Sequence, residues 1–276
     1  MTVRSNLPFE SYISVDAVHF STLKSIDKSP LHYRHACDTP REYTPALRLG
    51  RLTHSLLLSP EVPGVAVYAG RRAGKEWETF EAAHAGESIV KVEEIEHATA
   101  MREAIKRHAG ASALFARGRA EVSIEWLEGD LACKARLDWL GPSGVIDLKT
   151  TRSIDVRAFT REIAARHYHA QLAFYRAAAD AAQREDCPWY QGHAPCWIVA
   201  VESSPPHDVA VYRLPEEALE VGARKIAGWL DRVRECRASG VWPGVAPEAI
   251  DLTLPDWAAT DGLDDVDTNE LEGVTT

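Results

Sequence analysis

The sequence predicts an α/β protein whose mixed central sheet is flanked by helices and preceded by a helical region. Two observations support this fold class. Alternating apolar and polar residues mark strands in the middle of the chain, and amphipathic patterns with capping signals mark helices on both sides of them. We expect a single domain over residues 1–257, with a helical part at about 14–117 and an α/β core at about 118–240.

Helices are predicted in the first part of the chain. In residues 14–60, the stretch SVDAVHFSTLKSIDKSP has a cap-like start and a proline, Pro30, where we expect a helix to end. The stretch TPALRLGRLTHSLLLSP is apolar and is bounded by proline at both ends. Residues 76–117 are predicted to form further helix, because four apolar residues recur with loose helical periodicity: Ile95, Met101, Ile105 and Leu114.

Three strands are predicted between residues 120 and 151. Their sequences are AEVSIEWLEG, DLACKARLDWLG and GVIDLKTT. The first alternates clearly, which places Val122, Ile124 and Trp126 on one face.

The rest of the core is predicted to alternate between helix and strand. A long helix over residues 155–184 follows the third strand, with Asp155 as its N-cap. Two further strands, PCWIVAVESS and HDVAVYRL, come next. The last helix runs from about Pro215 to Ser239 and ends at Gly240.

The net charge of −10 lies mostly in the C-terminal part of the chain. Residues 245–276 contain nine acids and neither lysine nor arginine, whereas the other 244 residues contain 32 acids and 31 bases. The end of this part, residues 258–276, is acidic and poor in aromatic residues, which predicts a disordered tail. Because the rest of the chain is nearly neutral, it can still carry a basic groove for nucleic acid.

Several features favour a cytoplasmic protein. The chain has no apolar run of 18 residues, which argues against a membrane span, and its N-terminus lacks the apolar core of a secretion signal. The five cysteines are scattered and form no CxxC motif, so we expect neither a disulfide framework nor a structural zinc site.

The stretch GVIDLKTT, residues 144–151, carries two charges in a strand that is otherwise apolar. Asp147 and Lys149 are two residues apart and therefore share a face. The turn LGPSG precedes this strand. If Pro142 and Ser143 are its central pair, Asp138 of the preceding strand faces Asp147, with Cβ atoms about 5 Å apart. Two carboxylates so placed repel each other unless a divalent cation lies between them, and Mg²⁺ or Mn²⁺ fits such oxygen ligands.

Lys149 would then lie beside the metal, where its ammonium can hold an attacking water or stabilise charge on a phosphate. Asp147-Leu148-Lys149 is the only Asp/Glu-x-Lys triplet in the chain. Taken alone, the pair fits a structural ion pair at a strand end better than a catalytic site.

Three further sets of residues could belong to the same site. Gln171 and Tyr175 lie on one face of the long predicted helix, although this spacing also fits a core tyrosine beside a solvated glutamine. In GRLTH, the small Gly50 would let His54 approach another element, although an ordinary contact between helices gives the same pattern. Glu121 opens the first predicted strand and by itself could be a solvated charge.

Together these stretches resemble the PD-(D/E)XK nucleases of the RecB-like type. The matching motifs, in chain order, are GRLTH, AEVSIEW, CKARLDW, IDLKTT and QLAFY. The stretches STLKSIDKSPLHYRH, VAVESSPPHDVAVYRL and LPDWA are more specifically similar to the exonuclease VIII (RecE) domain of phages and prophages. The resemblance covers about residues 10–257 and implies a restriction-endonuclease-like core.

The resemblance also implies roles for individual residues. Asp138 and Asp147 would bind Mg²⁺ or Mn²⁺, with His54 as a further ligand and Glu121 as an acid near the metal. Lys149 would orient or activate the water. Gln171 and Tyr175 would contact DNA near the scissile phosphate. Some RecB-like nucleases hold an iron–sulfur cluster on four cysteines, and we expect none here because Cys187 and Cys196 have no adjacent partners.

The function that the resemblance implies is digestion of one strand from linear duplex ends, 5′ to 3′, by a ring-shaped homo-oligomer. The single strands would pass to an annealing protein in recombination, in a bacterial cell hosting a phage or prophage. Two alternatives stay open at this point: a non-catalytic DNA-binding or assembly protein on a decayed nuclease fold, and a RecB-like nuclease that acts on other ends or flaps.

Overall fold

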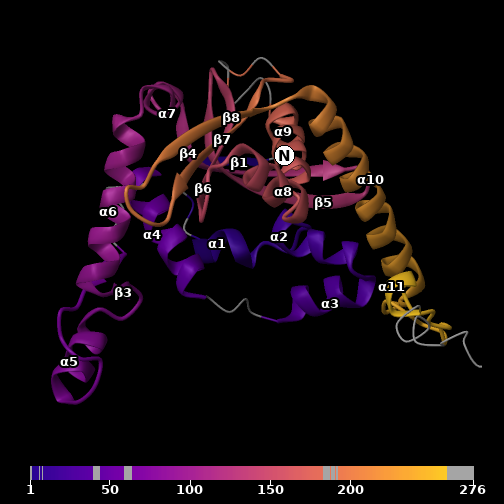
Figure 1. Ribbon diagram of the computed structural model, residues 1–276, viewed down its shortest axis with the longest axis horizontal. Coiled ribbons are helices and arrows are strands. Elements are labelled where there is room, and N and C mark those ends of the chain that lie inside the picture. Colours follow the sequence, from indigo (N-terminus) through magenta and orange to yellow (C-terminus); the bar gives the residue numbers. More distant parts are fainter. Residues whose placement is uncertain are drawn as a thin grey trace, which may run out of the picture.

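A six-stranded mixed sheet forms the centre of the protein (Figure 1). The computed structural model describes residues 2–5, 7, 9–39, 44–58, 64–182, 187, 190 and 192–259. Neighbouring strands are antiparallel except for the parallel pair β6–β7. The mixed sheet flanked by helices is confirmed. The strand order across the sheet is β1 (Thr2–Ser5), β4 (Arg119–Glu128), β5 (Leu131–Gly141), β6 (Gly144–Thr151), β7 (Cys196–Glu202) and β8 (Val209–Leu214).

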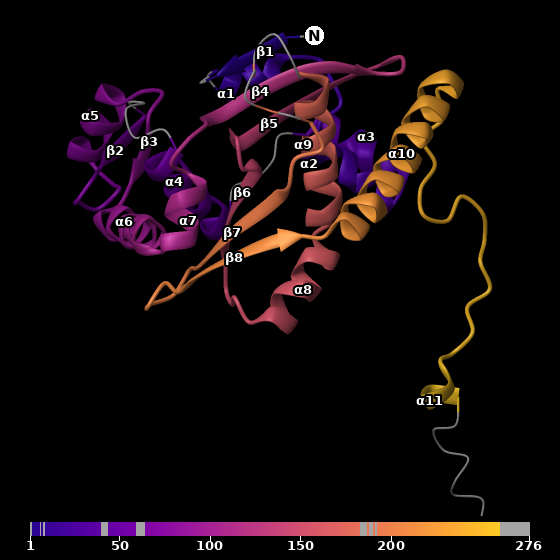
Figure 2. The ribbon, with the colours of Figure 1, turned by 90° about the horizontal axis from the view of Figure 1, so that it is seen from above.

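Helices cover both faces of this sheet (Figure 2). One face packs against α9 (Tyr168–Ala181), which in turn packs against α10 (Glu216–Ser239). The other face packs against α6 (Val92–Arg107) and α7 (Ala109–Leu114). The remaining helical segments are α1 (Phe9–Ser14), α2 (Phe20–Leu23), the 3-10 turn η1 (Lys24–Asp27), α3 (Pro30–Asp38), α4 (Pro45–Leu58), α5 (Lys75–Ala83), α8 (Val156–Ala165) and α11 (Asp256–Ala259).

The side chains of strand β6 alternate between the helix layer that contains α6 and the one that contains α9. Ile146 and Leu148 pack into the core on the α6 side, where Met101 and Ile105 are also buried. Each such side chain, fully buried, contributes about 1.5–3 kcal/mol. Asp147 and Lys149 alternate with them and so face the α9 side. The apolar half of the strand therefore fixes the direction in which its two charges point.

The predicted long helix over residues 155–184 is wrong as a single element. It is divided into α8 and α9 at His167, whose φ of 59° is left-handed. A continuous helix cannot pass through this conformation. The predicted start is confirmed, since the carboxylate of Asp155 accepts a hydrogen bond from the Ala158 N–H at 3.0 Å.

Two other helical predictions need correction. Pro30 begins α3 rather than ending a helix, and Ser29 caps it by accepting from the His32 N–H at 3.2 Å. Proline suits the first helical position because the N–H that it lacks would have no partner there. The helical part also contains two short parallel strands, β2 (Val65–Val67) and β3 (Ser88–Val90), which periodicity did not indicate.

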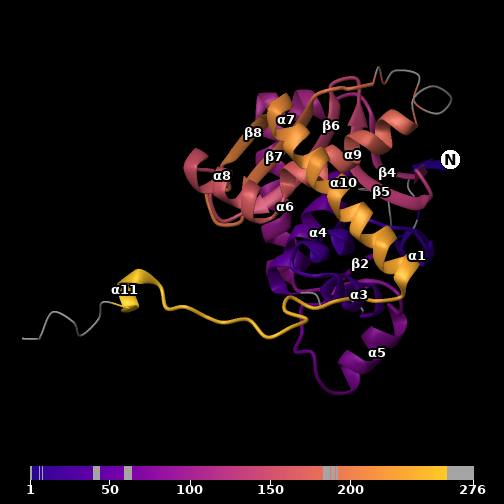
Figure 3. The same ribbon diagram turned by 90° about the vertical axis from the view of Figure 1, so that its right-hand side faces the viewer.

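The C-terminal end of α10 agrees with the prediction, because Gly240 is left-handed at φ 72°. Beyond it the chain runs away from the sheet towards α11 (Figure 3). The predicted disordered tail lies outside the described residues from position 260 onward. In the part of the chain that the structure describes, no helix is long and apolar enough to cross a membrane.

Candidate active site

The site begins where β5 and β6 separate. Their ladder pairs Gly141 with Gly144, Leu140 with Val145 and Trp139 with Ile146, and it stops there. This is the register predicted from the Pro142–Ser143 turn. The next residues along, Asp138 and Asp147, are the two carboxylates expected to face each other.

Side chains replace the missing ladder bonds at this point. The Leu148 N–H donates to Asp138 Oδ2 at 2.8 Å, and the Leu148 carbonyl oxygen accepts from His54 Nε2 at 2.9 Å. Buried backbone groups need such partners, so the separation is stable only with these two side chains present. Asp138 and His54 therefore hold open the gap in which they lie.

His54 lies on helix α4, which positions its side chain in this gap. A Cβ atom at Gly50 would lie 3.1 Å from Thr150 Oγ1, so the glycine lets α4 approach β6 as the GRLTH motif predicted. Because the Leu148 carbonyl can only accept, His54 carries its proton on Nε2. The unprotonated Nδ1 lies 3.6 Å from Asp138 Oδ1 and is free to bind a metal.

Three side chains come together as a candidate metal centre. One ligand atom each from His54, Glu121 and Asp138 lies within 4.8 Å of the other two. This set of one imidazole and two carboxylates suits a divalent cation. The ligands predicted from the sequence were His54, Asp138 and Asp147, so Glu121 stands here in the place of Asp147, whose role as a ligand stays a prediction.

Asp147 and Lys149 form a pair beside this centre. Lys149 Nζ lies 2.5 Å from Asp147 Oδ2, and the Asp147 side chain is only 2% exposed. Lys149 Nζ also donates to Gln171 Oε1 at 3.2 Å and lies 4.7 Å from the centre of the Tyr168 ring. The ammonium thus has two polar partners and lies near one aromatic ring.

Gln171 connects this pair to Tyr175. Its Nε2 donates to Asp147 Oδ1 at 3.1 Å and to the Tyr175 hydroxyl at 3.0 Å. Both residues lie on α9, whose first turn faces β6. The structure thus places them around Asp147 and Lys149, and their predicted contact with DNA remains untested.

Burial dominates the electrostatics of the site. It raises the pKa of Asp138 to about 7 and that of Asp147 to about 6, and the nearby Lys149 charge opposes both shifts. Burial also lowers the pKa of His54 and favours the neutral form that a metal needs. For Lys149, burial lowers the pKa, but the two carboxylates outweigh it and the pKa rises overall.

Two residues of the site were missed by sequence reasoning. Tyr168 supports Lys149 with its ring, and Arg136 donates to Glu121. Arg136 could have been found, because it lies two residues before Asp138 on the same strand face. Tyr168 could not, since its position depends on the break between α8 and α9.

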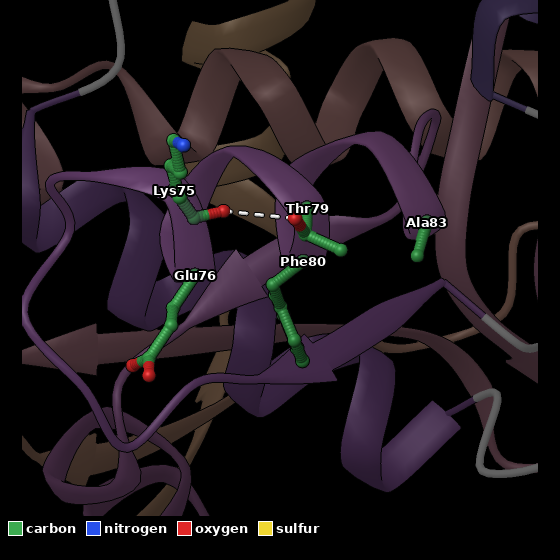
Figure 4. Close-up of a pocket in the computed structure, with 5 residues that line it drawn as sticks. All are labelled: Lys75, Glu76, Thr79, Phe80 and Ala83. Carbon is green, nitrogen blue, oxygen red and sulfur yellow. Dashed lines mark hydrogen bonds between the residues drawn. The ribbon is translucent and has the colours of Figure 1, made fainter.

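A hollow elsewhere on the surface contains none of these residues. It lies on α5 and has mostly apolar walls (Figure 4). Among the residues drawn in Figure 4, the Thr79 hydroxyl donates a hydrogen bond to the Lys75 carbonyl oxygen at 2.8 Å. The residues that line it are Lys75, Glu76, Thr79, Phe80 and Ala83.

Comparisons with known proteins agree with this fold. A crystal structure of a "Putative exonuclease" from Eubacterium rectale is similar, with a TM-score of 0.62 and 14% sequence identity, over 93% of this chain and 99% of that one. At this identity the likeness establishes the fold. No protein of curated function shows significant sequence similarity to the chain.

A match to a family model for a PDDEXK-like domain makes the chain a member of the PD-(D/E)XK nuclease superfamily, and the gap between β5 and β6 with its acid–lysine pair fits that assignment. Within it, the chain belongs to the family described as "PDDEXK-like domain of unknown function (DUF3799)", which matches residues 19–253.

Proposed function

We propose that the protein is a metal-dependent DNA exonuclease that digests one strand, 5′ to 3′, from the ends of linear duplexes. The observation that carries the proposal is the gap between β5 and β6, where His54, Glu121 and Asp138 meet beside the Asp147–Lys149 pair. Such an arrangement suits hydrolysis of a phosphodiester.

A divalent cation, Mg²⁺ or Mn²⁺, held by His54, Glu121 and Asp138 would polarise a phosphate oxygen and lower the pKa of a water. Lys149 has three N–H groups, and its contacts with Asp147 and Gln171 use two of them. The third can donate to the attacking water or to a phosphate oxygen. Gln171 keeps the ammonium and the Asp147 carboxylate in fixed relative positions.

The first test is digestion of a linear duplex labelled at one 5′ end, with and without Mg²⁺. We expect Mg²⁺-dependent release of nucleotides from the 5′ end, leaving the complementary strand intact. Covalently closed circles of the same sequence are the control and should resist. Cutting of the circles would indicate an endonuclease, and shortening of the labelled strand with its 5′ label retained would reverse the polarity.

We further propose that several copies close into a ring, a trimer or tetramer, and that an annealing protein receives the single strand. The support is electrostatic: residues 1–244 are nearly neutral, so charge alone holds DNA weakly between cuts. In a ring, digestion of long duplexes should continue after excess unlabelled DNA is added. Sedimentation of a monomer with DNA and Mg²⁺, together with early release, would contradict the ring.

Helix α8 offers a local positive surface beside the site. Its inner face is tied to the site through Glu162, which accepts from the Thr151 hydroxyl at 2.9 Å and lies 3.4 Å from the Tyr168 hydroxyl. On its outer face, Arg157 and Arg161 are exposed and have no ion-pair partner among the described residues. We expect these two arginines to contact DNA phosphates.

Replacing both arginines, Arg157→Ala with Arg161→Ala, should weaken DNA binding and leave the turnover rate at saturating DNA unchanged. The slope of log affinity against log salt should fall by about 2, one for each lost phosphate contact. Arg213→Ala with Arg71→Ala, two exposed arginines away from α8, is the matched control. If the slope of log affinity against log salt is the same for both double variants, α8 does not contact DNA.

A further inference from the structure

Arg136 is a partly buried cation next to the candidate metal centre. Its Nε donates to Glu121 Oε2, and its Nη1 donates to the Leu7 carbonyl oxygen at 2.7 Å. The side chains of Arg136 and Glu121 are 19% and 15% exposed. A guanidinium with this little solvent contact is held in one orientation by its partners, and in turn it orients them.

Glu121 has a backbone conformation that such a partner must support. Its φ is 51°, in the left-handed region that residues other than glycine seldom adopt. The β4–β5 ladder pairs Ala120 with Trp139 and Val122 with Leu137 but omits the pair of Glu121 with Asp138. A conformation of this kind costs about 1–3 kcal/mol and persists where the surroundings determine it.

The Glu121 carboxylate has two kinds of neighbour. Oε2 accepts from Arg136, while the carboxylate also belongs to the group of three that lies within 4.8 Å with His54 and Asp138. Partners that orient a metal ligand typically account for 10- to 100-fold in metal affinity. Arg136 has the position of such a partner.

We propose that Arg136 is a positioning residue that aims the Glu121 carboxylate at the metal position, with the Leu7 carbonyl as its second anchor. Leu7 precedes residue 19, where the family match begins, so a segment outside that match contributes to the site. The inference rests on the proposed function for the presence of a metal, and it does not depend on which DNA ends are cut.

The test is a titration of the protein with Mg²⁺ in the absence of DNA, in which the melting temperature is measured at each Mg²⁺ concentration. Arg136→Met should raise the Mg²⁺ concentration at half-effect about 10- to 100-fold. Arg136→Lys keeps the charge but loses the forked geometry, so it should also raise that concentration. Arg213→Met, the same change at an exposed arginine of β8, should leave it unchanged.

A double-mutant cycle joins Arg136 to Glu121. Glu121→Gln should raise the Mg²⁺ requirement to a similar degree, and combining it with Arg136→Met should add little, because both changes remove one interaction. In cleavage assays, excess Mg²⁺ should restore most of the rate of Arg136→Met. A residue that only supports the fold would not give this recovery.

Several results would overturn the proposal. A normal Mg²⁺ requirement with a reduced rate at saturating Mg²⁺ would mean that Arg136 acts on DNA. If Arg136→Met does not fold, the test rests on Arg136→Lys and Glu121→Gln. A wild-type Mg²⁺ requirement in either of these variants contradicts the positioning role of Arg136. A wild-type protein that binds Mg²⁺ without cutting DNA would defeat the proposed function alone, because the titration needs no cleavage.

Discussion

Replacing Lys149 with alanine should lower the rate of DNA cleavage by at least about 10²–10³-fold, the loss typical when one group that stabilises the transition state is removed. Lys149 Nζ is the one ammonium in contact with Asp147 within the described part of the chain. The Mg²⁺-dependent rise in melting temperature should be retained, because an ammonium is not a ligand. Asp147→Asn should abolish cleavage as well.

The two variants separate charge stabilisation from metal binding. Asp147→Asn should weaken the Mg²⁺ effect if Asp147 joins the ligands, whereas Lys149→Ala should not. Both should stay folded, since Gln171 still has partners at Tyr175. Lys75→Ala, an exposed lysine on α5, is the control. Digestion of linear DNA at the wild-type rate by either site variant would show that the assigned site is wrong.

The sequence predicted the site largely because its parts are local. The register of the β5–β6 hairpin follows from one Pro–Ser turn, and the ladder has this register up to Trp139 and Ile146, the residues next to Asp138 and Asp147. Alternation in β6 put Asp147 and Lys149 on one face. Gly50 in GRLTH indicated the close approach of α4 that brings in His54.

What the sequence did not reveal depends on contacts between distant segments. The break at His167 has no glycine or proline to mark it, and His167 Nε2 lies 3.3 Å from Asp27 Oδ2 in η1. The edge strand β1 has four residues and exists only because β4 pairs with it. The link from Arg136 to Leu7 likewise joins residues far apart in the chain.

Asp138→Asn should have opposite effects on activity and on stability. Cleavage should be lost, because a neutral amide is a poor ligand for a hard divalent cation. Without metal, the melting temperature should rise, since the substitution removes a buried charge that lies near Asp147 and Glu121. The asparagine oxygen can still accept from the Leu148 N–H, so the strand separation keeps its support.

The pH dependence identifies the cause of this stabilisation. Burial raises the pKa of Asp138 to about 7, well above that of an unfolded aspartate. A carboxyl group of this kind favours the folded state at low pH and loses that contribution as the pH rises through the raised value. The gain from Asp138→Asn should therefore be larger at about pH 8 than at about pH 6, by on the order of 1 kcal/mol.

Mg²⁺ should have the complementary effect. At about pH 8 it should raise the melting temperature of the wild-type protein, because it binds the folded state alone and relieves the repulsion among the carboxylates. The same addition should do less for Asp138→Asn. If Asp138→Asn lowers the metal-free melting temperature at both pH values, the carboxylates do not face each other as predicted. Removing a charge that its neighbours repel should stabilise the folded state.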